Sequence, residues 1–422
     1  MYQFNSLPIL LHCYIDTLLH FQKMSQKIAI TGMGIISSIG NNLEENFISL
    51  TTGKHGISDI EMFETRHAGS IKTGEIKLSN EELVQKLQLA EDNNVTRTAL
   101  LGMVAAKEAV ESAGISDINQ YKTGLISSTS VGGMDITEKY FYTYEDFPEK
   151  QKYIDAHDAG NSSLAIADLL GLKGMVSTIS TACSSAANAI MMGAKLIKNG
   201  VLDRVIVGGT DSLSKFTLNG FNTLMILTDS YNTPFDNDRK GLNLGEAAAF
   251  IVLESDEIVK KENKKVLAYL SGYGNANDAH HQTASSENGQ GAFLAMEKAL
   301  KVSGLDKENI DYINVHGTAT PNNDLSEGIA MIRIFGENQV PEFSSTKAFT
   351  GHTLAAAAGI EAVYSILAMQ NNVIFPNLNF KNKMKEFDLT PVTELKEKNI
   401  NHVLSNSFGF GGNCSTLIFS KS

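Results

Sequence analysis

The chain has 422 residues, of which 42% are hydrophobic and 19% charged. This length suggests two to three domain-sized units with a large buried core. The 35 glycines and only 7 prolines form no low-complexity runs, which excludes a largely disordered chain. Asp and Glu (47) outnumber Lys and Arg (35), and the net charge is −12. That balance argues against nucleic acid as the main partner, because neutralising phosphates needs a basic face.

The cysteines are few and far apart. There are 3, at positions 13, 183 and 414. An odd, widely spaced set is neither a disulfide framework nor a zinc site. We therefore expect a reducing, cytoplasmic compartment.

The first 23 residues differ in character from the rest of the chain. Pro8–Phe21 is apolar but contains Asp16, and it is too short for a membrane-spanning helix, which needs about 20 apolar residues. A secretory signal would carry Lys or Arg before the apolar stretch, and the first such residue here is Lys23. We interpret residues 1–23 as an extension from an upstream start codon, with Met24 as the working start. A helix lying on a membrane surface is the alternative.

Beyond Met24, short β-branched runs alternate with longer helical patterns. This alternation predicts an α/β protein with mainly parallel sheets buried on both faces. Gly32 and Gly34 predict a turn after the first strand. The expected strands are 27–31, 124–129, 204–207, 248–253, 266–270, 312–315, 342–345 and 401–404, and the expected helices are 95–113, 184–198, 291–302, 324–335 and 355–370.

The two halves of the chain echo one another faintly. Cys183 opens a helix of small residues in the first half, and His352 opens an Ala-rich helix in the second. The echo would fit two similar α/β halves packed face to face, with both helix N-termini directed at a shared site.

Cys183 stands where a strand passes into a helix, among small residues that let another group approach. A lone cysteine is often only a small buried core residue. At a helix N-terminus, however, the macrodipole favours the thiolate, which would move its pKa from about 8.5 toward about 7. An acyl group on such a sulfur is a thioester, ready for transfer.

Two histidines occupy similar places. His316 follows a strand and precedes Gly317, and His352 follows a glycine turn near Lys347. Either histidine alone could be structural. The cysteine and histidines lack the spacing of metal ligands, so we expect no catalytic metal. Two neutral imidazoles that donate to one oxygen would instead form an oxyanion or enolate site. The glycine-rich turn 408–412 is either a packing turn or a source of a backbone N–H beside that site.

Together these motifs resemble the β-ketoacyl-ACP synthase family (ACP, acyl carrier protein), and most closely its type II condensing enzymes with a Cys-His-His site. The similarity runs from about Lys27 to Phe419. The motifs that carry it are Ile30-Thr-Gly-Met-Gly, Thr181-Ala-Cys-Ser-Ser, Pro234-Phe-Asp-Asn-Asp-Arg, Gly245-Glu, Asn277-Asp-Ala-His-His, His316-Gly-Thr-Ala-Thr-Pro, Ser345-Thr-Lys-Ala-Phe-Thr-Gly-His and Asn406-Ser-Phe-Gly-Phe-Gly-Gly.

The resemblance implies a thiolase-like fold: two α/β halves in a five-layered α-β-α-β-α sandwich. We place the halves at 24–257, with the nucleophile, and 258–422, with the two histidines and the lysine. Cys183 would accept the acyl group. His316 and His352 would bind the thioester oxygen of a malonyl unit and support its decarboxylation. Lys347 would organise the site, paired with Glu327.

The resemblance also implies an oxyanion hole from the backbone N–H groups of Cys183 and Phe410, with Phe410 as a gatekeeper. No cofactor would be bound permanently, since the phosphopantetheine arm of the carrier protein brings the substrate. The other implied residues are Thr318, Thr320, Phe408 and Gly409 for substrate binding, Asp324 and Glu327 for structural support, and Glu361, Ser405 and Asn406 for a structural monovalent cation.

The implied partner is an acyl- or malonyl-loaded carrier protein, with a homodimer or a heterodimer as the assembly and no membrane. Such carriers are acidic, so we expect Lys and Arg to cluster at the tunnel mouth despite the net charge of −12.

The chain departs from the family pattern in places. Ala319 stands where glycine is commonest, which we interpret as a minor change. Gly412-Asn-Cys-Ser-Thr replaces the more usual Thr-Asn-Gly or Thr-Asn-Ala, and Gly245-Glu-Ala-Ala-Ala is poorer in glycine. These differences suggest a specialised branch, such as a synthase of an aryl-polyene or pigment cluster.

Two other functions stay open. A thiolase would use Cys414 as a second cysteine, but thiolases place proline after the Gly-His pair, whereas Thr353 follows His352. A buried thiol without a role is the other interpretation of Cys414. A non-catalytic chain-length partner would generally lack the nucleophile, and the presence of Cys183 with both histidines argues against it.

Overall fold

The computed structural model describes residues 28–422, so the expected extension at 1–23 lies outside the described part. Within it, ten strands are hydrogen-bonded in the order β10-β9-β13-β14-β8-β1-β7-β6-β4-β5. The strands are β1 (Ile28–Ser37), β4 (Thr123–Ser128), β5 (Val176–Ile179), β6 (Arg204–Asp211), β7 (Ala247–Ser255), β8 (Ala268–Asn277), β9 (Tyr312–Asn314), β10 (Glu342–Ser344), β13 (His402–Gly409) and β14 (Asn413–Ser420), with the small pairs β2 (Ile57–Asp59) with β3 (Lys72–Gly74), and β11 (Val373–Ile374) with β12 (Lys396–Glu397).

The two halves of this sheet have the same strand order. Numbered along the chain, the strands of each half lie in space as 3-2-4-5-1, namely β5-β4-β6-β7-β1 and β10-β9-β13-β14-β8. The first strands of the halves join them, through Ile28–Ile30 paired with Ala268–Leu270. The expectation of two similar α/β halves is therefore confirmed.

The pairing is mixed, so the prediction of mainly parallel sheets is wrong. β4, β5 and β6 run parallel, as do β9, β10 and β13. β1 and β7 are antiparallel to their neighbours, and so is β14. The reason is local for β14, because only a tight glycine turn separates it from β13 and a tight turn joins antiparallel strands.

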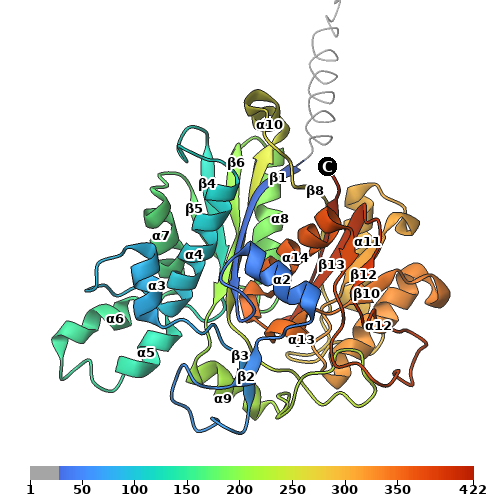
Figure 1. Ribbon diagram of the computed structural model, residues 1–422, viewed down its shortest axis with the longest axis horizontal. Coiled ribbons are helices and arrows are strands. Elements are labelled where there is room, and N and C mark those ends of the chain that lie inside the picture. Colours follow the sequence, from blue (N-terminus) through green and yellow to red (C-terminus); the bar gives the residue numbers. More distant parts are fainter. Residues whose placement is uncertain (1–27) are drawn as a thin grey trace, which may run out of the picture.

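Helices complete the five layers (Figure 1). α4 and α7 cover the outer face of the first half, α11 and α12 flank the second, and α8 and α14 lie between the halves. α14 is apolar around its circumference and buried from Ala357 to Met369, as a middle-layer helix requires. The helices are α2 (Leu43–Thr52), α3 (Asn80–Leu87), α4 (Arg97–Ser112), α5 (Met134–Tyr140), α6 (Gln151–Asp155), α7 (Ala159–Leu170), α8 (Ser185–Lys198), α9 (Lys215–Thr223), α10 (Asp256–Glu262), α11 (Gln290–Ser303), α12 (Pro321–Phe335), α13 (Lys347–Thr350) and α14 (Ala357–Asn371).

Gly32 and Gly34 do not form the expected turn, because β1 continues through both. A Cβ on Gly32 would lie 2.3 Å from the carbonyl oxygen of Ala109, and one on Gly34 would lie 2.2 Å from that of Ala105. The glycines thus let α4 pack on the strand at backbone contact distance. A bulge between Ile30 and Gly32 adjusts the register at this point.

None of the helices of residues 28–422 is both long and apolar enough to cross a membrane.

Candidate active site

A cavity of about 270 Å³ brings residues of the two halves together. The first half contributes Cys183, and the second contributes His316, His352 and the turn Phe408–Gly412. Cys183 is 4% exposed and each histidine 2%. Cys183, His316 and His352, predicted from the two sides of position 257, therefore line one small cavity, whereas Lys347, Asp324, Glu327, Glu361, Ser405 and Asn406 are not among its lining residues.

Cys183 lies on a sharp elbow between β5 and α8. Ala182, just before it, has a φ of +52°, which costs a non-glycine residue about 1–3 kcal/mol. The Cys183 sulfur is buried, and the backbone N–H of Phe410 acts on it to lower the pKa of the thiol. Burial raises the pKa of the thiol to about 12, and the positive charge of Lys347 offsets only part of this rise. The expected lowering toward 7 is wrong, because desolvation outweighs the helix terminus.

The two histidine rings meet edge to face, with centroids 5.4 Å apart and planes at 87°. Burial first, and the charge of Lys347 second, hold the pKa of both rings well below 6.5. Nδ1 of His352 accepts the backbone N–H of Leu354 at 3.3 Å. The neutral His352 ring therefore carries its proton on Nε2. The site holds two uncharged imidazoles, at least one of them with a defined N–H.

Two buried carboxylates fix the backbone around His316. Glu327 accepts the N–H groups of His316 and Gly317, both at 2.8 Å, and burial raises its pKa to about 7. Asp324 accepts the N–H of Ala319 at 3.2 Å, and burial raises its pKa as well. These carboxylates hold the loop after β9 from the first turns of α12.

Lys347 does not pair with Glu327, contrary to the sequence expectation. Its Nζ forms an ion pair with Glu361 of α14, and both side chains are buried. Glu327 is occupied by backbone N–H groups instead. The sequence could not distinguish the two glutamates, since each lies on a buried helix close to the site.

Two of the three side chains named for a monovalent cation, those of Glu361 and Asn406, have other partners. The second oxygen of Glu361 accepts the Ser407 hydroxyl at 3.3 Å. The amide of Asn406 donates to Glu327 at 3.1 Å and its oxygen accepts the Thr416 hydroxyl at 2.8 Å. Within residues 28–422, the Ser405 hydroxyl has no hydrogen-bond partner. The same part of the chain contains no cluster of three or more His, Cys, Asp or Glu that could hold a metal ion.

The rim of the cavity is formed in part by the loop after His316. The hydroxyls of Thr318 and Thr320 are 2.9 Å apart and both residues line the cavity. Ala319 between them has a φ of +65°. The change from glycine to alanine is therefore not minor, because this backbone conformation favours glycine.

Aromatic rings form another wall. The ring of Phe410 stacks on Phe221 with centroids 5.7 Å apart and planes at 24°. The ring of Phe408 lies 5.7 Å from that of His316. Between the two phenylalanines, Gly409 lies so close to the elbow that a Cβ there would be 2.7 Å from the carbonyl oxygen of Thr181. This close approach explains why the position is glycine.

The residues after the turn stand out in the sequence only as departures from a family pattern. Cys414 lines the same cavity, is 4% exposed, and has a pKa that burial raises to about 12. Asn413 points the other way along β14, as alternation requires, and bonds to the Cys183 elbow. The sequence marks Asn413 only by its departure from the usual family motif, and the contacts of its side chain become visible only in the fold.

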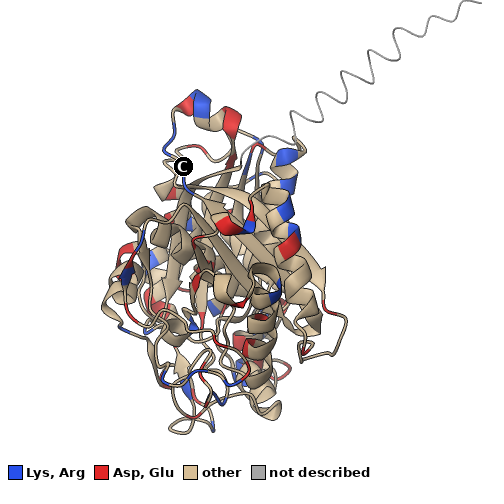
Figure 2. Ribbon diagram, turned by 90° about the vertical axis from the view of Figure 1, so that its right-hand side faces the viewer, with Lys and Arg blue, Asp and Glu red and all other residues tan. Residues whose placement is uncertain are grey.

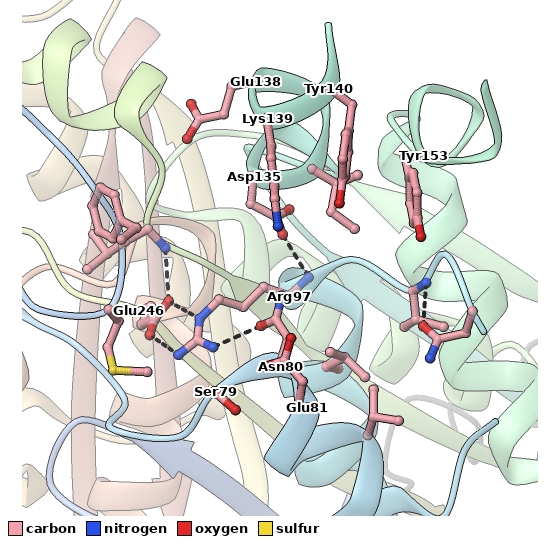
Figure 3. Close-up of a pocket in the computed structure, with 18 of the residues that line it drawn as sticks. Ser79, Asn80, Glu81, Arg97, Asp135, Glu138, Lys139, Tyr140, Tyr153 and Glu246 are labelled. Carbon is pink, nitrogen blue, oxygen red and sulfur yellow. Dashed lines mark hydrogen bonds and ion pairs between the residues drawn. The ribbon is translucent and has the colours of Figure 1, made fainter. Parts of the chain in front are cut away.

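A larger cavity, of about 990 Å³, lies elsewhere, beside α3, α4 and α5 (Figure 3). Its Arg97 is held by Glu246, by Asn80 and by backbone carbonyls, so its guanidinium has protein partners throughout. Burial raises the pKa of Asp135 in this cavity to about 6. Cys183 and the histidines do not line it, so we assign the chemistry to the smaller cavity.

A cysteine on a strained elbow that faces two neutral histidines, in a duplicated α/β fold, defines a condensing enzyme of the thiolase-like class. The comparisons with known proteins are more specific. The chain belongs to the β-ketoacyl synthase family: the model of the "Beta-ketoacyl synthase, N-terminal domain" matches residues 25–258, and that of the C-terminal domain matches residues 267–381.

Individual relatives agree. The chain is 32% identical to the 3-oxoacyl-[acyl-carrier-protein] synthase 2 of Vibrio cholerae over 94% of its length and 99% of the relative's. Among solved structures it is similar to the ishigamide ketosynthase/chain length factor, with a TM-score of 0.88, 28% identity and coverage of 94% and 99%. It is also similar to a ketosynthase in complex with its chain length factor from Xenorhabdus doucetiae, with a TM-score of 0.81, 28% identity and coverage of 94% and 98%.

Proposed function

We propose that this protein is a β-ketoacyl-ACP synthase that condenses an acyl thioester with malonyl-ACP to give 3-oxoacyl-ACP and CO₂. The observation that carries the proposal is the convergence of Cys183, His316 and His352 on one buried cavity. The family membership supports it, since relatives of the whole chain are named 3-oxoacyl-ACP synthase 2.

In the first step, the sulfur of Cys183 attacks the acyl thioester, and the phosphopantetheine thiol of the carrier leaves. The cysteine is neutral at pH 7, because burial raises its pKa to about 12. It must therefore lose its proton as the new bond forms, and the leaving thiolate takes up a proton. A neutral imidazole of the same cavity is suited to move this proton.

In the second step, the N–H groups of His316 and His352 bind the thioester oxygen of the malonyl unit. The bond to the carboxylate breaks, CO₂ leaves, and its electron pair forms an enolate that the two donors stabilise. The enolate carbon then attacks the acyl-Cys183 carbonyl. The N–H groups of Cys183 and Phe410 stabilise the resulting oxyanion, and the Cys183 thiolate leaves. Neutral histidines suit this role because a donor that stays uncharged does not need a counter-ion in the cavity.

The carrier's phosphopantetheine arm would pass the hydroxyls of Thr318 and Thr320 at the rim. Arg239 lies beside this rim, since its guanidinium donates to the backbone oxygens of Thr320 and Pro321. The segment with Lys381 and Lys383 packs next to it through the carboxylate of Asp236. Acidic residues lie among them, since Lys383 pairs with Asp388 and Arg239 lies 4.0 Å from Asp324, and Figure 2 shows Lys and Arg interspersed with Asp and Glu on the side it presents. The support for carrier docking at the rim is therefore the position of these three basic side chains beside Thr320, with a homodimer or a ketosynthase–partner heterodimer as the assembly.

The pathway is a finer proposal. We infer a specialised branch, such as aryl-polyene or pigment synthesis, from the sequence after the glycine turn and from the similarity to ketosynthases solved with chain length factors. Mass spectrometry of the acyl group on Cys183, in protein purified from its native host, tests this. A saturated long-chain acyl group would instead indicate the housekeeping fatty-acid reaction. A chain-length partner remains the second candidate, and the intact Cys-His-His set favours the synthase.

The reaction is tested on Cys183. Cys183→Ala is expected to abolish condensation of acyl- and malonyl-ACP, and Cys183→Gln to lose condensation but keep malonyl decarboxylation. Cys414→Ala is the matched control, since it removes the other thiol of the same cavity, and condensation should survive. Unchanged condensation in Cys183→Ala would refute the assignment. Cleavage of acetoacetyl-CoA without a carrier protein would point to a thiolase.

A further inference from the structure

Asn413 is the first residue of β14 and follows directly on the turn Phe408–Gly412. Its Oδ1 accepts hydrogen bonds from Ser184 Oγ at 2.8 Å, Asn188 Nδ2 at 2.9 Å and Asn275 Nδ2 at 2.8 Å. Three donors that converge on one atom require a carbonyl oxygen there, so the orientation of the Asn413 amide is defined. We call Asn188, Asn275 and Asn413 the amide cluster.

The amide cluster holds the residues on both sides of Cys183. Ser184, which follows the nucleophile, bonds to Asn413 directly and lies 2.8 Å from the carbonyl oxygen of Thr181. Asn188 donates both to Asn413 and, at 2.8 Å, to the hydroxyl of Thr181. The elbow contains a strained residue, so these bonds oppose its relaxation.

The glycine turn lies against the same elbow. A Cβ on Gly409 would be 2.7 Å from the oxygen of Thr181 and 3.1 Å from Ser184 Oγ. One residue later, the backbone N–H of Phe410 acts on the Cys183 sulfur and lowers the pKa of the thiol, against the larger effect of burial. Asn413 therefore connects the segment that carries one oxyanion donor to the elbow that carries the other.

We propose that Asn413 is a positioning residue that fixes the distance between the backbone N–H groups of Cys183 and Phe410. This inference rests on the proposed function and adds a residue to it. A threonine, the more usual residue at this place, would offer a hydroxyl oxygen one bond closer to the backbone. The asparagine carbonyl reaches further from the backbone and accepts hydrogen bonds from three elements: α8, β8 and the elbow.

The test compares three variants. Asn413→Leu removes the acceptor at similar size, and Asn413→Asp keeps an isosteric acceptor but adds a negative charge. Asn401→Leu is the control, at the exposed residue just before β13. Loss of one oxyanion donor typically lowers kcat about 10²–10³-fold. We expect Asn413→Leu to lower the kcat of condensation about 100-fold with KM for both carrier substrates within about twofold. We expect Asn413→Asp to keep most of the kcat and to shift the pH dependence of Cys183 alkylation by iodoacetamide to higher pH.

A kcat of Asn413→Leu within twofold of wild type, or a rise in KM alone, overturns the proposal. If that variant does not fold, Asn413→Asp decides: an alkylation profile that moves to higher pH supports the inference, and an unchanged profile overturns it. Alkylation requires no carrier substrate. It therefore reports on Asn413 even if the wild-type protein shows no condensation, a result that would refute the proposed function instead.

Discussion

The ammonium of Lys347 is ion-paired with the carboxylate of Glu361 inside the protein, where the two side chains are only 2% and 1% exposed. The lysine charge also lowers the pKa of His316 and of His352 and partly offsets the raised pKa of Cys183. The ion pair thus couples α14, the helix between the two halves, electrostatically to Cys183, His316 and His352.

Breaking the Lys347–Glu361 pair on one side should destabilise the fold strongly. Glu361→Gln leaves a buried lysine without its counter-charge, and removing one partner of a buried pair typically costs about 3–5 kcal/mol. We expect a lower Tm and denaturation midpoint for Glu361→Gln. The control is Asp388→Asn, which breaks the exposed pair with Lys383 and should cost at most about 1 kcal/mol. Equal losses in the two variants would contradict this account.

The neutral histidines predict how decarboxylation depends on pH. Since the pKa of both rings is well below 6.5, malonyl decarboxylation by Cys183→Gln should lose activity only at pH values below 6.5. The double variant Lys347→Met/Glu361→Gln removes the positive charge without leaving an unpaired one. It should move this acidic limb to higher pH, because the histidine pKa values rise. A pH–rate series of the two proteins measures the shift, and an unmoved limb would show that Lys347 does not act on the rings.

The same histidines affect stability. In the unfolded chain their pKa returns to its ordinary value of about 6.5, so below that pH the unfolded state binds protons that the folded state does not. These two groups therefore lower the free energy of unfolding as the pH falls from about 6.5. Urea titrations at pH 7 and pH 5.5 should show part of this loss disappear when His352 is replaced by Asn. No difference in pH sensitivity would argue against neutral, buried histidines.

Gly409 should tolerate no side chain. A Cβ would lie 2.7 Å from the oxygen of Thr181, so Gly409→Ala must push the turn away from the elbow and with it the N–H of Phe410. We expect condensation to fall by about 10²-fold or more, as for the loss of an oxyanion donor. The nearby Gly411→Ala meets no atom within 4 Å but has a φ of +81°, so it tests strain without a clash and should lose less. Equal losses would show that the clash of a Gly409 side chain with the elbow limits condensation no more than strain at Gly411 does.

The fold class, and the side chains that share the cavity, could be predicted from the sequence, but several contacts could not. Cys183, His316 and His352 stand in local patterns that indicate chemistry, and they meet in one cavity. The partner of Lys347 depends on which helix passes the site, and no spacing encodes this. The raised pKa of Cys183 follows from complete burial, which depends on the opposite half of the chain. The sequence does not predict strand β14, because its polar residues Ser415 and Thr416 hide the apolar pattern of a buried strand. Both are buried and hydrogen-bonded within the protein.

Gly34 tests whether β1 requires glycine for close packing against α4 rather than for backbone freedom. A Cβ at this position of β1 would lie 2.2 Å from the carbonyl oxygen of Ala105, so Gly34→Ala must push α4 away from the sheet. Overpacking of this kind typically costs about 1–3 kcal/mol. Gly160→Ala in α7 is the matched control, since its Cβ meets nothing within 4 Å, and alanine should stabilise a helix by about 0.5–1 kcal/mol. Urea denaturation of the two variants should therefore give changes of opposite sign. If Gly34→Ala also stabilised the protein, the close contact between β1 and α4 would not constrain the fold.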